Sequence, residues 1–107
     1  MNLDMTFSAL ADPNRRALLE SLEAGEQTLS NLASPLPISL MAIQKHIHVL
    51  EKAELVTTNK IGRNRYVRLR IDGLLNAADW MQNTKTRWNA ALERLEEEVL
   101  EEENKQK

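Results

Sequence analysis

Both histidines of the chain lie in one short stretch, SLMAIQKHIHVLEKAELV, over residues 39–56. Histidine binds metal ions and transfers protons, so a metal site or a catalytic site is the first chemistry to consider. Successive helical residues turn by about 100°, so His46 and His48 point to different sides of a helix. A shared ion needs ligands three or four positions apart. We therefore expect no metal site from this pair, and His46 is interpreted as a packed, hydrogen-bonded side chain at the helix margin.

The helical spacing divides this stretch into two faces. Ile43, Ile47 and Leu50 lie within about 40° of one another, which predicts a buried face. The other side mixes bare apolar residues with polar ones: Leu40, Met41, Gln44, Lys45 and His48. We call these five residues the mixed face. It could be solvated surface or a surface that enters another molecule.

The composition excludes several kinds of chemistry. The chain has 107 residues and no cysteine, which removes disulfides, thiolate metal sites and thiol redox sensing. No nucleophile elbow, phosphate loop or histidine–carboxylate grouping appears, so we predict no enzyme, no catalytic residue and no cofactor. No apolar run approaches the roughly 20 residues that span a bilayer, and the N-terminus does not resemble a signal peptide. We expect one domain over residues 1–103 with a frayed tail at 104–107, in a cytoplasmic protein.

Charge is distributed unevenly along the chain. Residues 39–71 carry seven basic and two acidic side chains, a balance of +5, although the whole chain has a net charge of −2. From residue 72 onward five basic side chains face nine acidic ones, a balance of −4. One part of the molecule is therefore suited to a polyanion while the other stays away from it.

Start and stop signals predict the elements that position the mixed face. Apolar spacing predicts a short helix over residues 3–10, and Asp12-Pro13 starts a second helix that Gly25 ends. Thr28 and Ser39 are expected to cap two further helices, over 29–33 and about 40–53. The stretches VTTNKI and RYVRLR, joined by Gly62-Arg63-Asn64, predict a β-hairpin.

A long last helix starts at Asp72. Its apolar residues recur at alternating spacings of four and three, which is typical of a helix that packs along another helix. From spacing alone the partner could be the same chain or a second copy. This seam consists of Leu74, Ala78, Met81, Lys85, Trp88, Leu92, Leu95 and Val99.

This order of elements is that of a winged helix-turn-helix. The stretches FSALADPNRRALLESLEAGE, TLSNLASPLPISLMAIQKHIHVLEKAELV and GRNRYVRL resemble the ArsR-type (ArsR/SmtB-like) transcriptional repressors, over almost the whole chain. The resemblance implies a mainly α (α+β) fold: about five helices, a two-stranded β-hairpin wing and a long C-terminal helix. It also implies a homodimeric repressor that binds double-stranded DNA at a pseudo-palindromic operator.

In that family the helix that contains QKHIHVL enters the DNA major groove, and the wing reaches a minor groove or its phosphates. Glutamine can form two bonds with an adenine edge, lysine can reach guanine or phosphate, and leucine or methionine can touch a thymine methyl. The DNA-binding residues implied are Ser39, Leu40, Met41, Gln44, Lys45, His48, Lys60, Arg63 and Arg65. Members often have a small hydroxyl residue at the place of Gln44, so base preference does not transfer.

The family dimerises through its first and last helices. The dimer-interface residues implied are Leu3, Phe7, Leu74, Ala78, Met81, Trp88, Leu92 and Leu95. Metal-sensing members use cysteines near the third helix, or histidines and carboxylates on the last one, and this chain lacks both sets. We therefore predict no metal site and identify no small-molecule ligand and no membrane partner.

Two alternatives remain open. A winged-helix protein-interaction module without DNA binding would need the same fold, and a metal-responsive repressor would need a non-standard site. One further departure concerns Glu54, where many members have glycine at a helix end. If that residue adopts a left-handed backbone conformation, glutamate lowers the stability of the fold by about 1 kcal/mol relative to glycine.

Overall fold

The computed structural model describes residues 2–105. Five α-helices, one short 3-10 helix and three strands follow one another along this range. They are α1 (Leu3–Leu10), α2 (Pro13–Ser21), η1 (Leu22–Ala24), β1 (Gln27–Thr28), α3 (Leu29–Ala33), α4 (Leu40–Lys52), β2 (Val56–Ile61), β3 (Asn64–Leu69) and α5 (Asp72–Lys105). The chain divides into two compact units between Ala77 and Ala78.

The first unit holds the hydrophobic core, which is built from the apolar faces of α2, α3 and α4. Leu18, Leu32, Ile43 and Leu50 are almost fully buried there, and Val67 of β3 closes the core from the sheet. The buried face expected for α4, with Ile43, Ile47 and Leu50, is confirmed. In α1 the buried residues are Thr6 and Ala9.

The three side-chain caps that the sequence predicts are present, and the Asn2 side chain caps α1 as well. The carboxylate of Asp12 accepts hydrogen bonds from the backbone N–H groups of Asn14 and Arg15, at 2.8 and 3.1 Å. Thr28 caps α3 through the Asn31 N–H, and Ser39 caps α4 through the Ala42 N–H. Because free N–H groups at a helix start need acceptors, these residues fix where each helix begins.

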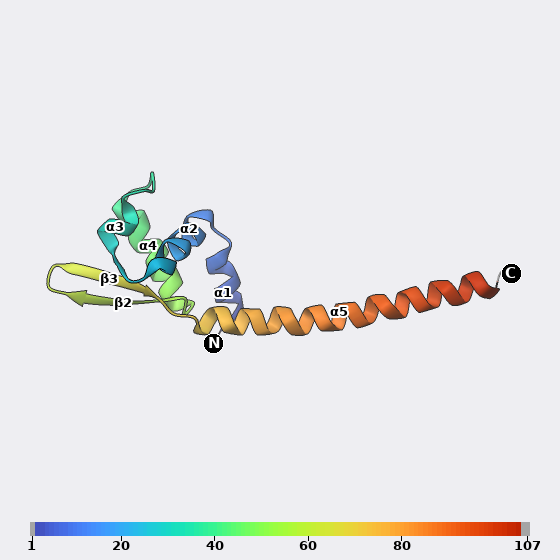
Figure 1. Ribbon diagram of the computed structural model, residues 1–107. Coiled ribbons are helices and arrows are strands. Elements are labelled where there is room, and N and C mark those ends of the chain that lie inside the picture. The colour runs from blue at the N-terminus through green and yellow to red at the C-terminus, as the bar shows by residue number, and fades with distance from the viewer. Residues whose placement is uncertain (1, 106–107) are drawn as a thin grey trace. The chain divides into compact units, whose positions relative to one another are not determined.

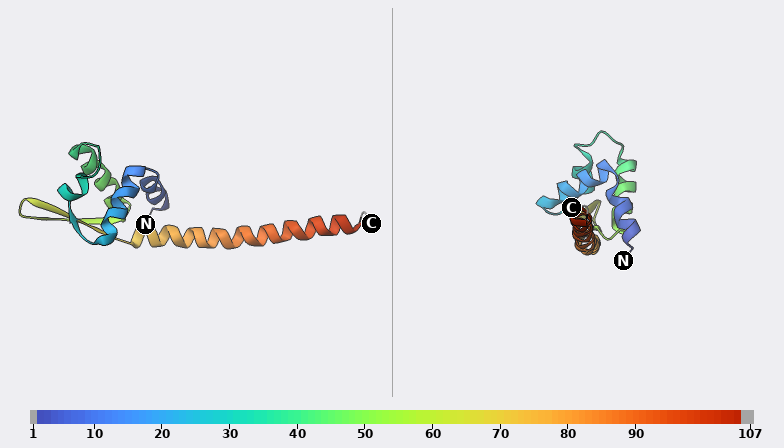
Figure 2. Two further views of the ribbon diagram at one scale, coloured as in Figure 1. Left: turned by 45° about the horizontal axis from the view of Figure 1, so that its top comes forward. Right: turned by 90° about the vertical axis from the view of Figure 1, so that its right-hand side faces the viewer.

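The wing is a hairpin of β2 and β3, paired antiparallel from Val56 opposite Leu69 to Ile61 opposite Asn64. Gly62 in its turn has a φ of +62°, a conformation that glycine adopts without strain. The hairpin extends away from the helices of the first unit, as Figure 1 and the left view of Figure 2 both show.

A third strand was not expected from the sequence. β1 pairs antiparallel with β3, through Gln27 opposite Val67 and Thr28 opposite Tyr66, so the sheet order is β1-β3-β2. The wing itself has two strands as predicted, but it belongs to a three-stranded sheet. A strand of two residues is too short to show an alternating pattern. It is defined only by its pairing with residues about forty positions later, which the sequence does not reveal.

Two further differences concern helix ends. The second helix was expected to continue to Gly25, whereas α2 ends at Ser21 and the chain tightens into η1 before that glycine. α5 is helical as far as Lys105, which includes two of the four residues of the expected frayed tail. Residues 106 and 107 lie outside the described residues.

The turn after α4 is fixed by a left-handed residue and a close backbone contact. Glu54 has a φ of +59°, the conformation considered for it from the sequence. Its carbonyl accepts a hydrogen bond from the Gly73 N–H at 3.1 Å, which fixes the start of α5 against the end of α4. A Cβ on Gly73 would lie 2.2 Å from the Ala53 carbonyl oxygen, so the residue must be glycine.

Arg70 reinforces this turn. Its backbone N–H donates to the Leu55 carbonyl, and its guanidinium pairs with the carboxylates of Glu54, at 3.3 Å, and Asp72. The hydrogen bond to Asp72 raises the pKa of Arg70.

The second unit is the part of α5 from Ala78 onward. Its apolar side chains are exposed: Trp80, Met81, Trp88, Leu92, Leu95, Val99 and Leu100. Trp88 is 67% exposed and Leu92 58% exposed, in a helix whose seam has the spacing of a packing surface. No helix within residues 2–105 combines the length and apolar composition needed to cross a membrane.

Candidate nucleic-acid interface

The mixed face of α4 is exposed, as the sequence predicts. Met41 is 66% exposed and Leu40 is 50% exposed, at the first turn of the helix. Gln44, Lys45 and His48 follow them on the exposed side. The backbone start of α4 is fixed by the bond from the Ala42 N–H to the Ser39 hydroxyl, so these side chains project from a rigid helix.

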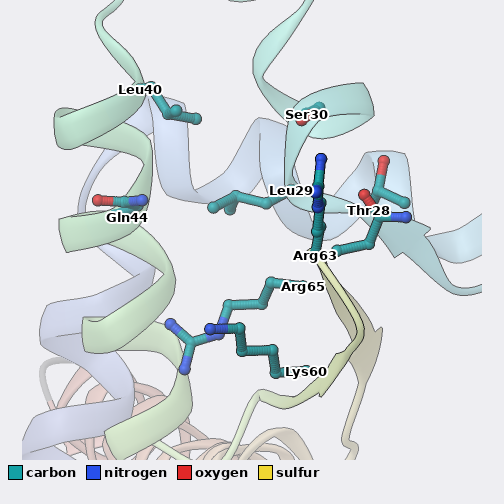
Figure 3. Close-up of a pocket in the computed structure, with 9 residues that line it drawn as sticks. Thr28, Leu29, Ser30, Leu40, Gln44, Lys60, Arg63 and Arg65 are labelled. Carbon is teal, nitrogen blue, oxygen red and sulfur yellow. The ribbon is translucent and has the colours of Figure 1, made fainter.

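Three basic residues of the wing, Lys60, Arg63 and Arg65, lie near the start of this face. Lys60 and Arg65 are directly opposite each other in the β2–β3 register, which places their side chains on one side of the hairpin. Figure 3 shows Arg65 extending from the wing toward α4, whereas Arg63 points toward Thr28 and Ser30. The structure thus brings the predicted wing residues next to the predicted helix residues.

Between the helices and the wing lies a cavity of about 360 Å³, which we call the helix–wing cavity. Three cationic side chains, two hydroxyls and two amides give it the donors that a phosphate ester needs. Its lining residues are Thr28, Leu29, Ser30, Leu40, Gln44, Lys60, Arg63, Asn64 and Arg65. Met41, Lys45 and His48 do not line it and lie further around α4.

Four residues of this cavity were missed by sequence reasoning: Leu29, Asn64 and the two hydroxyl residues Thr28 and Ser30. Thr28 and Ser30 come from β1 and α3, and Thr28 was predicted only as a helix cap. A hydroxyl residue in a short helix carries no functional signal of its own. These hydroxyls become neighbours of Arg63 only in the folded chain, as Figure 3 shows.

A side-chain bond connects α4 to the wing. The Thr58 hydroxyl of β2 donates to the Glu51 carboxylate of α4 at 2.5 Å. A second, smaller cavity of about 60 Å³ lies here, lined in part by Gln44, His48 and Arg65. Glu51 was also missed, although its place three residues after His48 puts it on the same side of the helix.

The ALADPNRR stretch forms the base of the α4 packing. The backbone N–H groups of Arg15 and then Asn14 hold the pKa of the Asp12 carboxyl below its ordinary value, against the effect of its partial burial. The Arg15 side chain reaches His46 of α4, with 3.3 Å between Nη1 and Nδ1. His46 is therefore half-buried and hydrogen-bonded at the helix margin, as expected.

The residues expected at a dimer interface are distributed over both units. In the first unit Leu3 and Phe7 are half-buried, and Leu74 is exposed. In the second unit Ala78, Met81, Trp88, Leu92 and Leu95 are exposed. Within residues 2–105 no group of three or more histidine, aspartate or glutamate side chains is arranged to hold a metal ion.

A helix-turn-helix with an exposed recognition face, followed by a cationic wing, defines the class of DNA-binding winged-helix proteins. Residues 10–59 match the model of a helix-turn-helix domain family. The transcriptional repressor SdpR of Bacillus subtilis is 31% identical over 81 residues, which are 76% of this chain and 90% of SdpR.

Two solved structures share the fold and much of the sequence. An ArsR family transcriptional regulator, RHA00566, is 37% identical with a TM-score of 0.78, over 81% of this chain and 90% of that one. An ArsR-like transcriptional regulator from Rhodococcus sp. RHA1 is 32% identical with a TM-score of 0.82, over 89% and 87%. The chain belongs to the ArsR family of winged helix-turn-helix transcriptional regulators, and its class of function is DNA-binding regulation of transcription.

Proposed function

We propose that this chain is a homodimeric repressor that binds a pseudo-palindromic operator and blocks promoter access. The observation that carries the proposal is the helix–wing cavity, where Gln44 and Leu40 of α4 meet Lys60, Arg63 and Arg65 of the wing. One rigid surface therefore offers base-reading side chains next to phosphate-binding ones. SdpR is itself named a transcriptional repressor, which agrees with this role.

Each residue has a role that follows from its chemistry. Gln44 reads a base edge in the major groove, and Leu40 and Met41 contact thymine methyl groups. Lys45 and His48 lie further along the same exposed side, within reach of a guanine edge or the phosphate backbone. Ser39 combines its capping bond with a phosphate contact.

The wing supplies the charge. Lys60, Arg63 and Arg65 neutralise phosphates, and Arg63 at the turn extends to a minor groove. Thr28 and Ser30 add neutral hydroxyl donors to a backbone phosphate in the helix–wing cavity.

The dimer follows from the apolar surface that the chain leaves exposed. A contiguous apolar stripe on a soluble protein marks an interface, and the second unit carries one along the α5 seam. Leu3, Phe7 and Leu74 extend this interface on the first unit. A two-fold dimer presents two copies of α4 to successive major grooves, about 34 Å apart.

The test is DNA binding as a function of salt. The purified protein is titrated with fluorescent fragments selected from genomic DNA, over a series of salt concentrations, while light scattering gives its mass. We expect the mass of a dimer. We also expect the logarithm of the DNA-binding constant to fall by about 0.9 per phosphate contact for each unit of the logarithm of salt concentration. Binding that does not respond to salt would favour a protein-interaction module, and a monomer at working concentration would remove the palindromic operator.

A further inference from the structure

The Arg15 guanidinium connects the end of α1 to α4. Its Nε donates to the Ala9 carbonyl at 2.7 Å and its Nη2 to the Ser8 carbonyl at 2.9 Å, in the last turn of α1. Its Nη1 lies 3.3 Å from His46 Nδ1 on α4, and 3.9 Å from the Asp12 carboxylate. With its side chain only 16% exposed, Arg15 is held by three elements at once.

This contact assigns the acceptor role to one ring nitrogen of His46. A guanidinium has only donors, so the ring nitrogen that faces Arg15 must be the acceptor. Nδ1 therefore carries no proton in this contact, and the ring hydrogen lies on Nε2.

The neighbouring arginine provides a contrast. Arg16 Nη1 donates to the Leu10 carbonyl at 2.7 Å, so Arg16 also satisfies the C-terminal end of α1. That bond joins α2 to α1, whereas the Arg15 bond continues to α4. A comparison of variants at the two arginines therefore distinguishes an effect on the stability of α1 from an effect on the position of α4.

We propose that Arg15 and His46 are positioning residues that hold α4 at a fixed orientation to the end of α1, and so set how the mixed face meets DNA. The proposal rests on the proposed function, in which α4 contacts the DNA. Because Leu3 and Phe7 of α1 belong to the proposed dimer interface, the Arg15–His46 contact also connects subunit pairing to the DNA-contacting helix.

The first arm of the test is spectroscopic and needs no DNA. The chain has two histidines, so ¹⁵N-labelled imidazoles give two separable sets of signals, with exposed His48 as the internal reference. We expect the His46 ring hydrogen to lie on Nε2 in wild type, and this tautomer preference to be lost in Arg15→Met. A His46 ring protonated on Nδ1 would overturn the proposal.

The second arm measures affinity for a bound genomic fragment, well below the unfolding transition. Arg15→Met and His46→Phe should each weaken binding roughly fivefold. The double variant should lose much less affinity than the product of these two factors. His46→Asn retains an acceptor at the place of Nδ1 and should bind like wild type. Arg16→Met is the matched control: it loses an α1 bond of the same kind and should leave affinity unchanged.

Several outcomes contradict the proposal. Equal losses for Arg15→Met and Arg16→Met would show that only the stability of α1 matters, as would His46→Phe binding as tightly as wild type. Wild-type protein that binds no fragment would instead refute the proposed function, and this positioning role with it.

Discussion

The Thr58 hydroxyl of the wing and the Glu51 carboxylate of α4 are joined by a hydrogen bond of 2.5 Å. Each residue comes from a different element of the proposed DNA surface, and the bond lies beside the small cavity that Gln44 and Arg65 line. The bond therefore connects the hairpin proposed to bind phosphates to the helix proposed to read bases. A duplex imposes a fixed distance between a base edge and the adjacent phosphates, so in that proposal the separation of hairpin and helix bears directly on affinity.

Replacing Thr58 with valine should loosen the wing. Valine has the same shape but no hydroxyl, so Glu51 loses its partner and β2 loses its side-chain connection to α4. We expect a loss of about 1–2 kcal/mol in unfolding free energy and roughly three- to tenfold weaker DNA binding. Urea unfolding and fluorescence anisotropy measure the two effects. Thr58→Ser retains the hydroxyl and should recover most of both, and affinity that is unchanged in the valine variant would remove this bond from the mechanism.

The wing arginines should contribute charge rather than sequence preference. Arg63→Ala with Arg65→Ala is expected to weaken binding to every fragment by about tenfold or more, and to reduce the slope of log K against log salt by about 2. Arg68→Ala is the matched control. Its side chain bonds Thr57 and lies outside the helix–wing cavity, so its removal should alter binding far less. Equal slopes for the double variant and wild type would mean that the wing does not touch the DNA.

Gln44 should determine which sequences are bound. Gln44→Ala removes the side chain proposed to form a two-pronged contact with a base, so discrimination between the selected operator and single-base variants should fall by about 1–3 kcal/mol at one position. Competition binding with a set of single-base variants measures this. Loss of affinity by the same factor for all variants would assign Gln44 to the phosphate backbone instead.

Local signals made most of the fold predictable. The caps at Asp12, Thr28 and Ser39 and the buried spacing of Ile43, Ile47 and Leu50 depend on residues within a few positions, and the structure has all of them. The winged helix-turn-helix class followed from the order of these elements, and the family from the resemblance of three stretches of the sequence to ArsR-type repressors. Strand β1 could not be found this way, because its two residues are defined only by their pairing with Tyr66 and Val67.

The site was predictable in part, for the same reason. The exposed side of α4 follows from its own periodicity, and Arg63 and Arg65 follow from the hairpin turn. The residues that join two elements could not be predicted in this way, because the sequence around either partner gives no sign of the other. Thr58 with Glu51 and Arg15 with His46 meet only after the chain has folded.

Asp12 should make folding stability depend on pH in the acid range. Its pKa is lowered from the ordinary value of 3.8 mainly by the Arg15 backbone N–H, so the unfolded chain binds the proton more readily. The resulting stability is fully present above that value and is lost as the pH falls through the lower, folded-state pKa. Asp12→Asn retains an acceptor oxygen but does not titrate. The unfolding free energy of wild type should be higher than that of Asp12→Asn at about pH 7, and this difference should shrink below about pH 4. An advantage that is constant with pH would show that the charge of the cap contributes nothing.

Gly73→Ala should destabilise the protein although the residue lies in a helix. In an open helix this change adds roughly 0.5–1 kcal/mol of stability, because alanine loses less backbone freedom on folding. Here the new Cβ would stand 2.2 Å from the Ala53 carbonyl oxygen, and both are backbone-fixed positions that no side-chain rotation can separate. The start of α5 must then move away from the left-handed turn at Glu54, and the bond from the Gly73 N–H to the Glu54 carbonyl is lost with it. We expect a net loss of about 2 kcal/mol or more in unfolding free energy, measured by urea titration. A variant more stable than wild type would show that the α4 and α5 backbones are not in contact at this turn.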